Sequence, residues 1–202
     1  MATISHGTQP IAEEDQLRAQ FYALLAALLA RPADAEMLAR LAGIEGDDTP
    51  IGKGLRTLSE VARATTPDAV EQEYNNLFIG IGKGELTPFG SYYLTGFLNE
   101  KPLARLRSAM DRHGITRADE VSEPEDHIAS VCEMMSGLIT GAFGSSLDLV
   151  EQREFYREHI GPWAGRFFAD LEAARAAAFY MPVGAIGRLF MEIEAEAFEM
   201  TA

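Results

Sequence analysis

The sequence is poor in several features that would point to a function class. It has one cysteine, Cys132, in 202 residues, so no disulfide can form within the chain and nothing indicates an oxidising compartment. Positive charge is also scarce: 17 Lys and Arg stand against 31 Asp and Glu, a formal net charge of −14. A nucleic-acid backbone or an anionic membrane surface would be repelled by this charge, whereas a cationic partner would be attracted. We therefore expect no nucleic-acid ligand.

Long apolar runs and targeting signals are missing as well. The longest apolar run, residues 21–30, has about half the length that a helix needs to span a bilayer. Residues 1–11 lack the basic and apolar regions of a secretory leader. These features predict a cytoplasmic chain without membrane insertion.

The apolar residues that are present follow helical spacing. Leu17, Phe21, Leu24, Leu25 and Leu28 fall at i, i+4, i+7, i+8 and i+11, which is typical of one broad helix face. Comparable patterns predict further helices over residues 34–43, 51–64, 67–78, 101–113, 128–139, 147–159, 161–178 and 182–199. No segment alternates with period two for long enough to predict a sheet. The sequence thus predicts an all-α fold, a single bundle-like domain of about eight to ten helices.

The polar segment 116–122 is the best candidate for a hinge. We expect an N-terminal lobe over about 15–115, a hinge over 116–127 and a C-terminal lobe over about 128–200. Residues 1–14 are expected to be disordered or loosely attached.

A glycine-rich segment at 80–85 superficially resembles a phosphate-binding loop. A Walker loop, however, needs Ser or Thr after its lysine, and Lys83 is followed by Gly84. A dinucleotide-binding loop leaves a strand and enters a helix, whereas this segment follows a helix and leads towards Pro88. The pattern favours a plain connection after a helix.

Two later segments each allow two interpretations. The aromatic segment 88–94 could line a groove for a partner peptide, or its tyrosines could pack into the core and hydrogen-bond the backbone. The acidic segment 123–127 could cap the helix that follows, with Ser122 and Glu125 as a capping box. It could instead form a polar patch, with Asp126 and His127 accepting hydrogen bonds from a cationic ligand.

Catalytic and metal-binding patterns do not occur in the sequence. The four histidines are isolated from one another, and no Glu-x-x-His or Gly-x-Ser-x-Gly motif occurs. Cys132 lies on an apolar helix face, where a buried thiol is inert. We expect neither catalytic residues nor metal ligands. Two alternatives stay open: a helical adaptor for a mature protein partner, and a hydrolase that uses Cys132 and His127.

Three motifs, taken together, resemble the TorD/DmsD/NarJ family of cytoplasmic chaperones for molybdenum enzymes. The first covers residues 73–80 and includes Glu73, Tyr74, Leu77, Phe78 and Gly80, which we interpret as structural. The second is the aromatic segment 88–94, and the third is the Glu-Pro-x-Asp-His sequence at 123–127. Their order and separation match the pattern of that family.

The resemblance implies a chaperone without covalent chemistry or a cofactor of its own. Such proteins bind the twin-arginine signal peptide of a molybdopterin-containing oxidoreductase, delay its export and assist cofactor insertion. Weak GTP binding, and a monomer or a domain-swapped homodimer, are further properties that the family implies.

A receptor for paired guanidinium groups and an apolar stretch needs carboxylates beside an apolar, aromatic-lined groove. We expect the peptide groove to be bordered by residues of the second and third motifs, namely Phe89, Ser91, Tyr92, Tyr93, Glu123, Pro124, Asp126 and His127.

Overall fold

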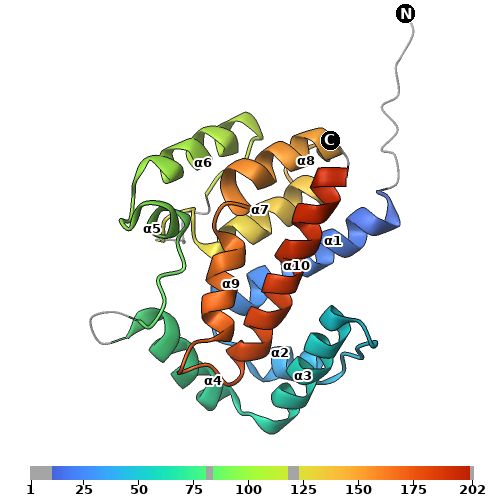
Figure 1. Ribbon diagram of the computed structural model, residues 1–202, viewed down its shortest axis with the longest axis vertical. Coiled ribbons are helices and arrows are strands. Elements are labelled where there is room, and N and C mark those ends of the chain that lie inside the picture. The colour runs from blue at the N-terminus through green and yellow to red at the C-terminus, as the bar shows by residue number, and fades with distance from the viewer. Residues whose placement is uncertain (1–10, 81–83, 118–122, 201–202) are drawn as a thin grey trace, which may run out of the picture.

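The protein is described by a computed structural model over residues 11–80, 84–117 and 123–200. Within these ranges it forms ten α-helices, two π-helical turns and one isolated β-bridge, with no strand (Figure 1). The predicted all-α fold is therefore confirmed. In chain order the helices are α1 (Glu13–Ala30), α2 (Ala35–Ala42), α3 (Pro50–Ala64), α4 (Pro67–Tyr74), α5 (Gly90–Thr95), α6 (Lys101–Arg112), α7 (Ile128–Thr140), α8 (Leu149–Phe155), α9 (Ala164–Glu172) and α10 (Tyr180–Met200). The π-helical turns, Asn75–Ile79 and Tyr156–Ile160, extend α4 and α8.

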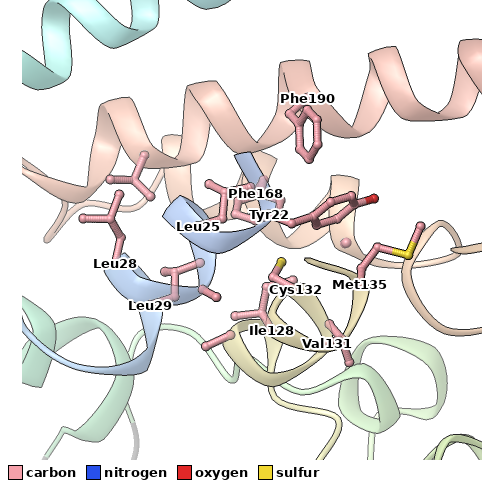
Figure 2. Packing of buried hydrophobic residues seen from close by; sticks show 14 of the residues in the cluster. Tyr22, Leu25, Leu28, Leu29, Ile128, Val131, Cys132, Met135, Phe168 and Phe190 are labelled. Carbon is pink, nitrogen blue, oxygen red and sulfur yellow. The ribbon is translucent and has the colours of Figure 1, made fainter. Parts of the chain in front are cut away.

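The centre of the molecule is the packing of α1 against α7, with α10 lying against α9 and α3 (Figure 1). Figure 2 shows Tyr22 and Leu25 of α1 close to Cys132 of α7, with Phe190 of α10 above them. All four side chains are buried in one core cluster. This core joins helices from both sides of the expected hinge. The division into two lobes stays a prediction, and residues 118–122 of the hinge lie outside the described residues, as do residues 1–10 of the expected loose terminus.

Local signals account for most helix ends. Thr49 and Thr66 each accept a hydrogen bond from a backbone N–H in the first turn of α3 and α4, and a proline follows each of them. Gly114, with a φ of 68°, follows the end of α6, as glycine commonly does after a helix.

Two predicted elements were wrong. The helix expected over 161–178 ends at Glu172, and the short helix α5 begins at Gly90, between residues 78 and 101, where no helix was predicted. The first difference has a non-local cause, because two distant glutamates accept the backbone N–H groups of residues 175, 176, 178, 179 and 180.

A buried ion pair fastens α1 to α10. Glu194 is fully buried and accepts hydrogen bonds from Arg18 Nε at 2.6 Å and from the Tyr22 hydroxyl at 2.9 Å. Arg18 also donates to Gln152 of α8 at 2.7 Å. The ends of three helices are thus held by one polar network. Among the described helices, none is long and apolar enough to cross a membrane.

Candidate functional site

The second and third motifs meet directly. Phe89 and His127 form an antiparallel β-bridge, although they lie 38 positions apart in the sequence (127 − 89). On either side of the bridge, Gly90 N–H donates to the Asp126 carbonyl and Ile128 N–H donates to the Pro88 carbonyl, both at 2.9 Å. The start of α5 and the start of α7 are therefore fixed to each other by backbone hydrogen bonds.

Asp126 is buried at this junction, only 3% exposed. Its Oδ2 accepts the N–H of Ser91 at 2.6 Å, so the carboxylate supplies a cap to the first turn of α5. The other carboxylate oxygen, Oδ1, and the Ser91 hydroxyl are buried and have no hydrogen-bond partner within the described chain. Asp126 therefore positions the aromatic segment and does not border an open groove.

His127 is the residue that begins α7. Its Nδ1 accepts the Ala129 N–H at 3.2 Å, and its ring lies edge-on to Phe89 with 5.1 Å between ring centroids. Burial lowers the pKa of His127 to about 4, so the ring is neutral at pH 7. The carboxylate of Glu123, half exposed, lies 3.9 Å from His127 Nε2. The Pro124 carbonyl accepts the His127 N–H at 3.2 Å.

The capping box expected at Ser122 and Glu125 does not begin α7. The helix starts after His127, and Ser122 lies outside the described residues. Glu125 instead binds the guanidinium of Arg107 on α6, with distances of 2.8 and 3.0 Å, and lies 3.7 Å from Arg117. Partial burial, the largest single effect on Glu125, raises the pKa of its carboxyl. The hydrogen bonds to this carboxylate and the charges of Arg107 and Arg117 together outweigh burial, so the pKa lies below its ordinary value.

The first motif makes structural contacts. Glu73 accepts three backbone N–H groups, those of Ala178, Phe179 and Tyr180, at 2.8, 3.0 and 2.8 Å. It thereby caps the start of α10 from a distant helix. The Tyr74 hydroxyl donates to the Leu29 carbonyl in the last turn of α1, at 3.1 Å.

The other residues of this motif pack in the core or end a helical turn. Leu77 is fully buried, and the ring of Phe78 meets those of Tyr74 and Tyr180 edge-on. Gly80, with a φ of 62°, ends the π-helical turn in the left-handed conformation that glycine tolerates. Residues 81–83 of the glycine-rich segment lie outside the described residues.

Tyr92 and Tyr93 line a first hollow of about 420 Å³ between α5 and α9. The Tyr93 hydroxyl donates to Asp170 at 3.0 Å, and the Arg166 guanidinium lies 5.8 Å from the centre of the Tyr93 ring. Burial, more than the nearby carboxylate, raises the pKa of Tyr93. Glu85 lies at the rim of this hollow and accepts the N–H groups of residues 175 and 176.

A second hollow of about 520 Å³ lies between α1 and α7, and we call it the α1–α7 groove. Its floor consists mostly of small side chains, and its titratable side chains are those of Glu123, His127 and Glu133. The residues that line it are Ala23, Ala26, Ala27, Ala30, Glu123, His127, Ala129, Ser130, Glu133, Ser136, Gly137, Thr140, Ala142 and Phe143. A smaller hollow of about 150 Å³ adjoins it and shares Glu123, Ser130, Glu133 and Phe143.

The eight residues expected at the peptide groove thus divide into three groups. Tyr92 and Tyr93 line the first hollow, whereas Glu123 and His127 line the α1–α7 groove. Asp126 and Ser91 are buried at the junction, and Phe89 and Pro124 are half-buried beside it.

Several lining residues were missed by sequence reasoning because they lie outside the three motifs. They include Glu85 in the connection before α5, Glu133 on α7, Phe143 in the turn after α7, and Arg166 and Asp170 on α9. One local signal was available for Glu133, since it is a lone charge in the middle of an otherwise apolar and small-residue helix.

The hydrolase alternative needs a reactive thiol at Cys132. Cys132 is fully buried, and burial raises the pKa of its thiol, so the nucleophilic thiolate is not formed at neutral pH. In the part of the chain that the structure describes, no group of three or more His, Cys, Asp or Glu side chains could hold a metal ion.

Comparison with known proteins agrees with the motifs. The family model for the nitrate reductase delta subunit matches residues 44–169, more than half of the chain. The TorD chaperone of Vibrio atlanticus (strain LGP32) is 22% identical over 203 residues, covering 90% of this chain and 94% of the relative. The TorD chaperone of Shewanella pealeana (strain ATCC 700345 / ANG-SQ1) is 23% identical over 206 residues, covering 92% and 91%.

One solved structure, a proposed redox enzyme maturation protein from Archaeoglobus fulgidus, shares the fold with a TM-score of 0.58. It is 19% identical and covers 93% of this chain and 99% of its own. The chain belongs to the nitrate reductase delta subunit family, the TorD/NarJ family that its three motifs resemble.

Proposed function

We propose that the chain is a cytoplasmic chaperone that binds the precursor of a molybdopterin-containing oxidoreductase through its twin-arginine signal peptide, its apo form or both. Binding would delay export and assist insertion of the cofactor. The chaperone would do this without covalent chemistry and without a cofactor of its own. GTP binding and domain-swapped dimerisation are properties that only the family resemblance supports.

The observation that supports this proposal is that the α1–α7 groove, which is largely apolar, also has carboxylates that form no ion pair with a Lys or Arg of the described residues. The α1–α7 groove has an apolar floor, and the carboxylates of Glu123 and Glu133 lie at its rim. A peptide that joins two guanidinium groups to an apolar stretch needs this combination, because carboxylates accept bidentate hydrogen bonds from arginine. The net charge of −14 would also speed encounter with a basic peptide.

The test is calorimetric titration of the whole chain with a synthetic peptide that carries two adjacent arginines and an apolar tail. We expect binding that weakens as salt is added, and weaker binding of a peptide with two lysines in place of the arginines. Equal affinity for both peptides, or no binding, would contradict recognition through the twin-arginine signal peptide. A complex with a mature enzyme that survives deletion of its signal peptide would support the helical-adaptor alternative instead.

A further inference from the structure

We propose that the α1–α7 groove receives the apolar stretch of the signal peptide and that Glu123 and Glu133 bind its two guanidinium groups. This inference rests on the function proposed above. It adds the surface on which the signal peptide binds, the direction in which the peptide lies, and the residues that select arginine. The arginines would lie at the end of the groove that adjoins the smaller hollow, and the apolar stretch would run along α1.

The small side chains on the floor of the groove would let a peptide lie close to the backbones of α1 and α7. Ala23, Ala27 and Ala30 of α1 fall at i, i+4 and i+7, on one face of the helix, and all three are exposed. Across the groove, α7 contributes short side chains too, those of Ser130 and Ser136. An apolar helix or strand could therefore lie close to both helices and bury this floor, in the manner of peptides that dock in helical grooves.

Negative charge is concentrated at one end of the groove. Glu123 and Glu133 line both the groove and the smaller hollow, and Glu133 forms no ion pair with any residue that the structure describes. His127 adds no positive charge at pH 7, because burial lowers its pKa to about 4. The nearest cation in the smaller hollow, Arg117, is already paired with Glu125 at 3.7 Å. This end therefore attracts a cation.

Phe143 stands where the apolar and acidic parts meet. Its ring is partly exposed, lines both hollows and rests on the backbone of α7 at Gly137. A Cβ at position 137 would lie 2.2 Å from Phe143 Cε2, so only glycine allows the ring to lie there. An aromatic face beside two carboxylates suits arginine better than lysine, because a guanidinium can stack on the ring while it pairs with a carboxylate.

The experiment measures the affinity of the twin-arginine peptide for four variants of the whole chain. Ala27→Gln fills the apolar floor, and Glu133→Lys reverses one rim charge. Ala69→Gln and Glu71→Lys make the same substitutions on exposed positions of α4, which does not line the groove. We expect both groove variants to weaken binding by about tenfold and both α4 variants to leave it unchanged. Circular dichroism and thermal unfolding of each variant confirm that it is folded.

Variants of the peptide then show which part of it lies at the acidic end of the groove and which part lies on the apolar floor. Replacing the peptide's arginines by alanine should remove most of the effect of Glu133→Lys, and replacing its apolar residues by serine should remove the effect of Ala27→Gln. If folded groove variants bind as the wild type does, the peptide lies elsewhere: the inference is wrong and the proposed function stands. If the wild type does not bind, both fail. A concentration-dependent dimer that Ala27→Gln disrupts would show that a second copy covers the groove and would also overturn the inference.

Discussion

The carboxylate of Glu73 is predicted to be one of the main supports of the C-terminal helix. It lies on α4 and accepts the N–H groups of residues 178 and 179, just before α10, and of Tyr180, the first residue of α10. Helix α10 offers these N–H groups no acceptor, because no helical carbonyl lies one turn before them. Glu73→Ala removes all three acceptor contacts and the negative charge at the positive end of the helix dipole.

The magnitude follows from three charge-assisted hydrogen bonds on a half-buried side chain. Buried bonds of this kind contribute about 1.5–3 kcal/mol each, and water that reaches the vacated N–H groups reduces this to about 1 kcal/mol each. With a dipole contribution of about 0.5 kcal/mol, the loss is about 2–4 kcal/mol. For a chain of this size it corresponds to a fall of about 5–15 °C in the unfolding temperature.

Urea unfolding followed by circular dichroism measures this loss directly. Glu71 lies two residues away on the same helix, is exposed and makes no contact through its carboxylate in the described chain, so Glu71→Ala is the matched control. We expect the control to change the unfolding free energy by less than about 0.5 kcal/mol. A loss below about 1 kcal/mol for Glu73→Ala would refute the reasoning that this glutamate holds α10.

Three further predictions concern buried groups. Burial lowers the pKa of His127 and His159 to about 4 in the folded chain. As the pH falls below about 6.5, these histidines are therefore protonated in the unfolded chain before they are protonated in the folded chain. The free energy of unfolding is then full above about pH 6.5 and decreases as the pH drops towards 4. Urea unfolding at pH 7 and pH 5 should differ by about 2 kcal/mol for each histidine, and a flat profile would contradict this. Glu194→Ala leaves Arg18 without its buried partner and should cost about 3–5 kcal/mol in the same assay, whereas a loss under about 1 kcal/mol would show that the pair is not stabilising. A thiol-alkylating reagent should label Cys132 slowly until denaturant is added; fast labelling of the native chain would revive the hydrolase alternative.

Local pattern was enough to predict most of the helices, but not the short helix α5 and not the burial of every side chain. The stripe on α1 correctly places Leu25 and Leu28 in the core, because a helix face that repeats every three to four residues must be covered. Leu17 belongs to the same stripe, yet it is 52% exposed. It lies in the second turn of α1, ahead of Ala19, which is the first buried residue of the helix.

The tertiary role of the motif residues could not be predicted from spacing alone. Glu73 and Glu85 act on a backbone segment about 90 to 107 positions away, which no sequence window reports. Likewise, the bridge between Phe89 and His127 shows why the second and third motifs occur together, but only the structure places them in contact. The groove was not predicted because alanine favours a helix whether it is buried or exposed, so its presence on α1 does not indicate an exposed surface.

The most direct test of the account is to purify the tagged chain from its own cells and identify what is bound. We expect the precursor of a molybdopterin-containing oxidoreductase with its twin-arginine signal peptide still attached, and loss of that precursor when the two arginines are replaced by lysines. Recovery of the same enzyme in equal amount after the arginines are replaced would contradict recognition through the signal peptide.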